Sequence, residues 1–550
     1  MQIISSWSLQ KTTGFPRNHC VGNAFALISH ENCGGSMSIS PLLLITLLFG
    51  FHISAQATED ISLDRLMLLH DILPEQSLRI DNHLSQSSNT NQQEKTNVSQ
   101  HQTPQIALPY RVLIDVRSNH SDGAHDFDTL IALAKKRYLD AIAFTEHDRY
   151  SIRFGIDPVP HILGYSQEHP SLYQTGIDNF FTDLKRVQQQ SNITVFAGTE
   201  SIPGYDWQGI PFKNLSLHNA EKHLITLGVK TPENITKLSS YTLEYGYGNK
   251  ELSLVFWFVF IFGLIFILMR KKKRGIALLL AGSFIAFMTT WLMKPKVDTD
   301  QAFIESAHAQ NLFVIWTHPG TKSGVRQGSM GVFLNTPPYN REVFQSHTAD
   351  AFAATYGDND NNTIAGGLWD QYMMDYLAGY IGKPIWAVAA GDYHEEGQSG
   401  EFLGNFPMDV WAKSTKEDDI LTALKQGRMV AWQMGKQHDL SLNTLSLLYT
   451  NPETQKTETM FTGDTAVVSA NVTLVTSLKE MDDTKLPIQL KAQWVVDGQI
   501  VGHVLLSSDM KTAQSYPLHL STGRHVIRLQ IPAQQGIRME ANPFLVQVRE

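Results

Sequence analysis

Short apolar runs alternate with amphipathic stretches between residues 110 and 395. The segment 129–137 has helical spacing and separates two of these runs. Six runs have the texture of buried β-strands, at residues 111–116, 140–147, 193–200, 223–229, 312–318 and 385–394. Alternating strand and helix patterns are typical of a parallel α/β sheet or barrel.

The pattern becomes all-β from about residue 440. Short runs of alternating polarity follow one another to the end of the chain, without helical spacing between them. Turn signals stand at Asp497-Gly498 and at Ser521-Thr522-Gly523. Several short strands separated by turns predict a small β-sandwich, here over residues 439–550.

Two longer apolar runs interrupt the α/β part. Residues 252–269 and 275–293 contain no charged residue, and each approaches the roughly 20 residues that cross a bilayer as a helix. Five cations, Arg270–Arg274, lie between them and favour a cytoplasmic loop. We therefore expect a transmembrane hairpin over residues 251–294, in contact with the membrane through 252–293. The alternative, a hairpin in the protein core, would have to bury these cations.

The N-terminal part is typical of an exported protein. The apolar run 41–53 is followed by Ser54-Ala55-Gln56-Ala57, which indicates a leader and signal peptide over residues 1–57. Residues 1–36 are either an extended leader or precede a true start at Met37, and an uncleaved anchor is the other alternative. Residues 58–109 combine weak helical periodicity with a polar linker. Together with the hairpin, this places the α/β part and the sandwich on the periplasmic or extracellular side of the inner membrane.

Composition excludes several classes of function. The 550 residues carry a formal charge of −9, which argues against a nucleic-acid coat protein, since that needs a basic face. Aromatic residues make up 10% of the chain, too many for global disorder. The two cysteines, Cys20 and Cys33, precede the expected cleavage site, so the mature chain has no thiol nucleophile. No G-x-S-x-G, P-loop or C-x-x-C motif is present.

Ionisable residues stand at the ends of the predicted strands. In (β/α) barrels such residues line the active face, and a polar group at the end of a buried strand is costly without a partner. Imidazole combined with carboxylate suits zinc, manganese or iron better than calcium. The pattern predicts a site with several divalent ions, built from Asp115, Asp122, His147, Glu200, His223, His318, Asp392 and His394.

Six short motifs carry a family resemblance. They are Ser121-Asp122-Gly123, Phe144–Asp148, Ala197–Glu200, His223–Gly228, Thr317–Gly320 and Gly391–His394. In this order, over residues 110–395, the sequence resembles the PHP (polymerase and histidinol phosphatase) superfamily. The resemblance implies a distorted (β/α)7 barrel, formed here by residues 110–250 and 295–438. It also implies two or three divalent ions that serve mostly phosphoester hydrolysis. The ligand roles implied fall on Asp122, His147, Glu200, His223, His318, Asp392 and His394.

The first motif departs from the family pattern of His-x-His. Counting back from Asp122 places Asp115 and Arg117 at these positions. Asp115 can still bind a metal ion, whereas a guanidinium has no lone pair to offer. One metal subsite is then lost, or rebuilt with His120. Alternatively, Arg117 replaces the charge of a metal ion and grips a phosphate oxygen in bidentate fashion.

Three functional hypotheses follow. The first is a phosphoesterase for a small phosphorylated substrate, in which metal ions activate water and Arg117 or Arg149 steadies the developing oxyanion. Asp148 and Arg149 then contact the substrate or support the ligands, unless they form a plain salt bridge. The second is an ester or amide hydrolase with the same site. The third is an inert barrel that acts as a scaffold, with the β-sandwich binding a protein of the cell envelope.

Overall fold

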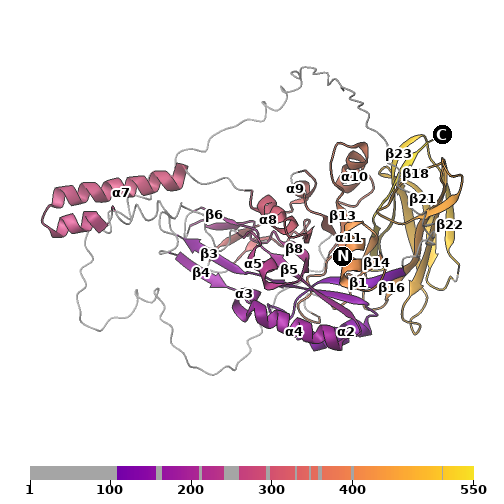
Figure 1. Ribbon diagram of the computed structural model, residues 1–550, viewed down its shortest axis with the longest axis horizontal. Helices are drawn as coiled ribbons and strands as arrows, with labels where there is room; N and C mark the ends of the chain where they lie inside the picture. Colours follow the sequence, from indigo (N-terminus) through magenta and orange to yellow (C-terminus); the bar gives the residue numbers. More distant parts are fainter. Residues whose placement is uncertain are drawn as a thin grey trace, which may run out of the picture. The chain divides into compact units, whose positions relative to one another are not determined.

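The computed structural model describes the greater part of the chain from residue 108 onward. The described ranges are 108–155, 164–209, 213–240, 259, 261–292, 298–328, 331–345, 348–356, 362–397, 402–510 and 512–549. All of them belong to one compact unit, Gln100–Glu550 (Figure 1). The expected signal peptide at 1–57 and nearly all of the polar linker at 58–109 lie outside the described residues.

One large mixed sheet organises the described part of the chain. Its fifteen strands include the order β13-β12-β9-β8-β5-β2-β1-β14-β15. The first seven of these carry the residues of interest and are β1 (Leu108–Val116), β2 (Ala141–His147), β5 (Thr194–Ser201), β8 (Leu224–Val229), β9 (Phe313–Trp316), β12 (Ala351–Thr355) and β13 (Trp386–Ala389). The α/β class that the sequence predicts is therefore confirmed.

The sheet is not uniformly parallel, in contrast to the prediction. β1, β2 and β5 are parallel neighbours, as are β9, β12 and β13. β8 runs antiparallel to both β5 and β9. A single parallel bridge between Val116 and Tyr393 brings the end of β1 to the segment after β13, but a closed seven-stranded barrel is not confirmed. The described residues between β5 and β8 form two short strands and no crossover helix, so β8 returns antiparallel to β5.

Amphipathic helices cover this sheet. In α2 (Phe127–Lys136), the buried residues are Phe127, Leu130, Ile131 and Ala134, which form one helical stripe. Its N-cap is Asp126, whose side chain accepts a hydrogen bond from the backbone N–H of Thr129 at 2.9 Å. The other helices are α3 (Leu172–Thr175), α4 (Ile177–Gln190), α5 (Pro232–Thr236), α8 (Thr299–His308), α9 (Asn340–Gln345), α10 (Leu368–Ala378) and α11 (Glu417–Lys425).

The C-terminal β region, residues 440–549, contains the strands that the all-β pattern predicts. It shares the large sheet, which continues through β14 (Met408–Ala412), β15 (Met429–Gln433), β24 (Ile537–Ala541), β23 (Gly523–Gln534), β20 (Gln489–Val496) and β21 (Gln499–Ser507), with β18 (Thr465–Val468) and β25 (Phe544–Val548) alongside. A second sheet comprises β17 (Thr457–Met460), β16 (Leu440–Thr450), β19 (Asn471–Glu480) and β22 (Gln514–His519). A common core that includes Trp432 and Trp494 joins the two sheets. Since β15 pairs with β24, this region continues the main sheet rather than starting a new one.

Small β elements extend from the ends of the main strands. β3 (Ser151–Gly155) pairs with β4 (Gly164–Glu168) after β2. A four-stranded sheet combines β6 (Asp206–Gln208) and β7 (Ser216–His218) with β10 (Val325–Gln327) and β11 (Phe333–Asn335). Trp207 links the two additions, because its indole donates to the Arg153 carbonyl at 2.8 Å.

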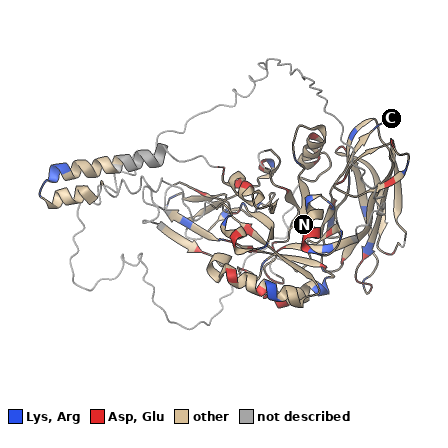
Figure 2. Cartoon of the chain, viewed as in Figure 1, with Lys and Arg blue, Asp and Glu red and all other residues tan. Residues whose placement is uncertain are grey.

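The expected membrane hairpin falls partly outside the described residues. α7 (Lys272–Leu292) contains nearly all of the second apolar run. It begins within the cationic cluster, which is blue at the start of this helix and at the turn before it (Figure 2). Within the ranges that the structure describes, no helix combines the length and the apolar character needed to cross a membrane. The transmembrane prediction is therefore not supported there.

Candidate metal centre

The predicted ligands meet at one edge of the main sheet. His147 and Glu200 lie side by side at the carboxyl ends of β2 and β5, where they are register partners. His223 comes just before β8, but β8 is antiparallel to its neighbours, so its first residues lie at this same edge. The pairing of these strands thus brings together strand ends that are far apart in sequence. In each of three groups of residues, the candidate ligand atoms lie within 4.8 Å of one another: Asp122, His147 and His394; Glu200, His223 and His318; Asp115, Glu200 and Asp392.

The first group consists of Asp122, His147 and His394. The Oδ2 atom of Asp122 lies 3.4 Å from His147 Nε2 and 3.4 Å from His394 Nε2. Burial works against the charged form of Asp122, but hydrogen bonds with both histidines hold its pKa below the usual value. Burial also disfavours charge on His394, yet its hydrogen bond to Asp122 raises its pKa to about 9. One carboxylate oxygen and two imidazole nitrogens thus face a common point.

The second group, Glu200, His223 and His318, is buried throughout. His223 Nδ1 lies 3.3 Å from Glu200 Oε1 and 3.4 Å from His318 Nε2. The remaining ring nitrogens, His223 Nε2 and His318 Nδ1, are buried without a hydrogen-bond partner. Buried polar atoms rarely stay unpaired in a structural role. His147 Nδ1 connects the two groups, at 3.5 Å from Glu200 Oε2.

The third group contains only carboxylates and surrounds Arg117. The guanidinium donates to Asp115 Oδ1 at 3.0 Å and also to Glu200, and it lies 3.4 Å from Asp392 Oδ1. It further donates to Thr145 Oγ1 at 2.8 Å. The side chain of Arg117 is entirely buried. Its Nη donors therefore face protein oxygens and are not directed toward solvent.

Protonation follows from this arrangement. Burial opposes the charge of Glu200, but Arg117 and then His223 hold its pKa well below the ordinary value. Burial likewise opposes charge on His223, whereas Glu200 raises its pKa to about 9. Burial raises the pKa of Asp115 to about 7, despite the opposing effect of Arg117. Protons on imidazoles thus balance the carboxylates, and a divalent ion competes with them for the same atoms.

Three site residues adopt an unusual backbone conformation. Asp115, His318 and Asp392 have φ angles of 67°, 33° and 47°. Residues other than glycine seldom adopt positive φ angles. Two hydrogen bonds hold Asp115 and Asp392 in place. The backbone N–H of Asp392 donates to Asp115 Oδ2 at 2.7 Å, and that of Tyr393 donates to the Asp115 carbonyl at 3.0 Å. Such strain is concentrated at functional sites, because the surrounding structure must enforce it.

One supporting residue escaped sequence reasoning. The buried carboxylate of Glu146 accepts hydrogen bonds from the backbone N–H of Ser118 at 3.1 Å, from its hydroxyl at 2.6 Å and from the Ser121 hydroxyl. These bonds fix the loop that presents Asp122. The only signal in the sequence was a carboxylate immediately before His147 in an otherwise apolar strand.

The other predicted site residues lie beside the three groups. Asp148 is buried and its Oδ2 atom has no hydrogen-bond partner. Arg149 turns to Tyr173, with its guanidinium carbon 4.2 Å from the ring centroid. His120, the alternative ligand, instead faces Asp183, with 3.2 Å between Nε2 and Oδ2. The structure thus places His120 outside the three ligand groups, while the Nη donors of Arg117 are already occupied by protein oxygens.

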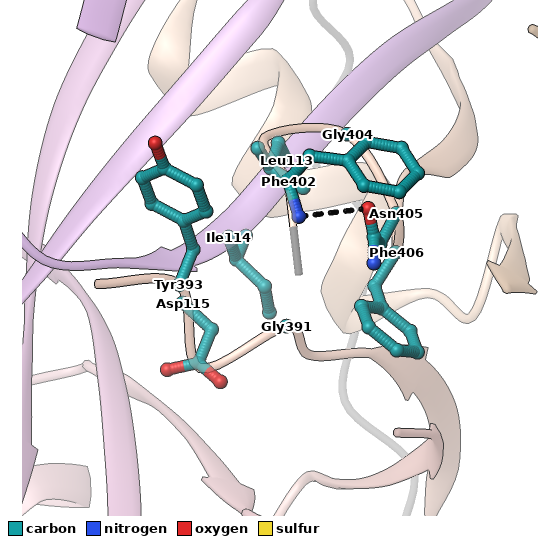
Figure 3. Close-up of a pocket in the computed structure, with 9 residues that line it drawn as sticks. All are labelled: Leu113, Ile114, Asp115, Gly391, Tyr393, Phe402, Gly404, Asn405 and Phe406. Carbon is teal, nitrogen blue, oxygen red and sulfur yellow. Dashed lines mark hydrogen bonds between the residues drawn. The ribbon is translucent and has the colours of Figure 1, made fainter. Parts of the chain in front are cut away.

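A small pocket lies next to this centre but does not cover it. Its lining includes Asp115 together with Phe402, Asn405 and Phe406. Figure 3 shows the Asp115 carboxylate pointing away from the two phenylalanine rings. Asp115 is the only member of the three ligand groups in this lining. The pocket is therefore packing space behind β1 rather than a substrate site.

No family model and no curated protein matches the chain, whereas several solved structures are similar to it. A similar solved structure is a two-domain protein from Bacteroides vulgatus ATCC 8482, described as containing a predicted PHP-like metal-dependent phosphoesterase. It is 13% identical, the match covers 81% of this chain and 98% of that chain, and the TM-score is 0.34.

Two further solved structures are similar over about half of the chain. One is described as a putative metal-dependent phosphoesterase from Bifidobacterium adolescentis ATCC 15703, with 13% identity, coverage of 57% and 96%, and a TM-score of 0.27. The other is an amidohydrolase from Chromobacterium violaceum with bound sulfate and no metal, with 14% identity, coverage of 52% and 88%, and a TM-score of 0.23. The chain is thus similar to PHP-like metal-dependent phosphoesterases. With TM-scores this low, the assignment of the site rests on its own side chains.

Proposed function

We propose that the chain is a metal-dependent hydrolase of PHP type that cleaves phosphoesters. The observation that carries this proposal is the pair of adjacent groups, Asp122–His147–His394 and Glu200–His223–His318, joined where His147 Nδ1 lies 3.5 Å from Glu200 Oε2. Mixed imidazole and carboxylate donors suit zinc, manganese or iron. When bound, such ions lower the pKa of water toward neutrality and polarise a phosphoryl oxygen.

The protein side chains supply orientation. Arg117 holds Glu200 by one carboxylate oxygen, which leaves Oε1 directed at His223. Glu146 fixes the loop of Asp122. Asp148 has an unpaired buried oxygen next to His147, and it and the neighbouring Arg149 are the side chains we propose as substrate contacts.

A carboxyl ester or an amide is the alternative substrate class, because the same activated water attacks an acyl carbon. The inert scaffold is the other alternative. It is favoured by Arg117 in the first motif and by exposed apolar residues on β21, where Ile500 and Leu505 are 47% and 53% exposed. In that case the C-terminal β region binds an envelope protein and the three ligand groups hold no catalytic ion.

The test combines metal content with activity. Full-length protein is purified without chelator, its metals are measured by mass spectrometry, and an aryl phosphate, a phosphodiester and an aryl ester are assayed. We expect bound zinc, manganese or iron, and loss of phosphoester cleavage in His318→Ala. The matched control is His308→Ala, since His308 pairs with Asp350 at 3.0 Å outside the three groups. Absence of bound metal, or equal activity of both variants, contradicts an enzyme.

We also propose that this hydrolase is exported and anchored in the inner membrane by residues 252–293, with the centre on the outer side. Support comes from the two uncharged runs around Arg270–Arg274. Large apolar side chains here are exposed, among them Leu268 at 79% and Leu280 at 66%. A reporter fused at Lys272 is expected to behave as cytoplasmic and one at Glu550 as external. The reverse result rejects this orientation.

A further inference from the structure

We infer that the guanidinium of Arg117 is a built-in cation that takes the place of a metal ion among Asp115, Glu200 and Asp392. The centre then binds ions in its two imidazole-containing groups and excludes one from the third. This inference rests on the proposed function, since it concerns the same site. It assigns Asp115 to Arg117 rather than to a metal ion, which differs from the role expected from the sequence.

Geometry separates the third group from the other two. In each group the ligand atoms lie within 4.8 Å of one another, but the third encloses a guanidinium. Arg117 Nη1 lies 3.0 Å from Asp115, and Nη2 contacts Glu200 and lies 3.4 Å from Asp392. The guanidinium therefore occupies the space between the three carboxylates. Because it has no lone pair, it cannot share that space with a metal ion as a ligand.

The charges lead to the same conclusion. The third group has three carboxylates and no imidazole, so without a cation it would bury charges of one sign at high cost. Glu200 and Asp115 are fully buried, and Asp392 is 27% exposed at its side chain. Arginine stays protonated at any physiological pH, which makes it a permanent counter-charge. In the other two groups, the imidazole nitrogens supply lone pairs to an ion once it displaces their protons.

The contacts of Arg117 argue against a role in binding the substrate. Nη1 donates to Asp115 and to both Thr145 oxygens, and Nη2 faces Glu200 and Asp392. Nε is buried without a partner, and the whole side chain has no exposed surface. A phosphate oxygen could reach the guanidinium only by displacing a carboxylate. Arg117 is thus a positioning residue that orients Glu200 and Asp392 from within the protein.

The experiment counts ions. Wild type, Arg117→His and the control Arg524→His, an exposed position on β23, are saturated with Mn²⁺ or Zn²⁺, freed of excess by gel filtration and analysed by mass spectrometry. Two ions per chain are expected for the wild type and for Arg524→His, in line with the two imidazole-containing groups. Arg117→His opens the third group to an ion, so three are expected, together with a larger rise in the thermal midpoint on adding metal.

A second variant tests the inference even if Arg117→His does not fold. Asp115→Asn keeps the shape of the side chain and is expected to retain two ions, since Asp115 contacts Arg117 and the backbone N–H of Asp392 but belongs to neither imidazole-containing group. Three ions in the wild type, two in folded Arg117→His, or fewer than two in Asp115→Asn would each overturn the inference while leaving a metal hydrolase intact. A wild type that binds no ion overturns the proposed function, and the inference with it.

Discussion

Arg117 and Arg528 are both buried among carboxylates, but their surroundings differ. Arg528 on β23 donates to both oxygens of Asp370, from Nε at 2.6 Å and from Nη2 at 2.9 Å. It also reaches Glu540 at 3.2 Å and the Gln530 amide oxygen at 2.8 Å. Arg538 adds a second cation at 3.2 Å from Glu540. Here two arginines face two acids, and the cluster is balanced.

The cluster around Arg117 is not balanced by arginine alone. One guanidinium faces three carboxylates, and Asp122 adds a fourth nearby. Ring nitrogens of His223 and His318 remain unpaired in the buried part. A balanced buried network needs nothing further and connects α10 to the C-terminal β region. The cluster around Arg117 needs further positive charge, which either protons on its imidazoles or metal ions supply. This exchangeable charge distinguishes a functional cluster from a structural one.

The largest expected effect is on the balanced cluster. Arg528→Met leaves Asp370 and Glu540 buried with too few partners, and breaking such a pair costs about 3–5 kcal/mol of stability. Urea unfolding measures this loss. Ion content is expected to remain that of the wild type. The control is Arg524→Met on the same strand, an exposed residue that hydrogen-bonds the Leu377 carbonyl at 2.6 Å. A folded Arg528→Met that loses its ions would show that the two clusters are coupled.

The second effect concerns catalysis rather than stability. His147→Asn removes the imidazole that links the two groups, and we expect kcat/KM to fall roughly a hundredfold or more, since even outer contacts of metal ligands are worth 10–100-fold. The unfolding midpoint in the presence of chelator changes little. His438→Asn is the control, because His438 pairs with Glu480 at 2.9 Å in the C-terminal β region. Equal activity in both variants would remove His147 from the centre.

A third, smaller effect tests the support of the first group. Glu146→Gln disturbs the bonds from Ser118 and Ser121, at a cost of about 1–3 kcal/mol. It also weakens ion binding at Asp122, by roughly tenfold, and a metal titration followed by calorimetry measures this. Glu168→Gln is matched to it, since Glu168 accepts from the Ser151 hydroxyl at 2.7 Å away from the three groups. Unchanged affinity in Glu146→Gln would make its role purely structural.

The sequence predicts the ligands at the strand ends but not the residues that they contact. Polar residues after apolar runs, such as His147 and Glu200, could be found because a buried strand tolerates them only at its end. His223 stands at the beginning of an apolar run and not at its end, and the antiparallel direction of β8 explains why it still lies at this edge. What Arg117 contacts depends on Glu200, 83 positions away.

The balanced cluster illustrates the same limit. Arg528 and Asp370 are 158 residues apart, and no local pattern marks them as partners. The continuation of the main sheet into the C-terminal β region was equally hidden, because strand pairing such as β15 with β24 is a long-range choice. The alternation of polarity predicts which elements form. It does not predict which edges meet.

The smallest expected effect marks the boundary of the functional cluster. His120 was the sequence alternative for rebuilding a metal subsite, but its ring faces Asp183 at 3.2 Å and packs 5.0 Å from the Phe127 ring. His120→Asn is therefore expected to cost only about 1 kcal/mol, with ion content and kcat/KM unchanged. Because His120 lies two residues from Asp122, a loss of one ion here would extend the unbalanced cluster beyond the three groups, and Arg117 would no longer account for its composition.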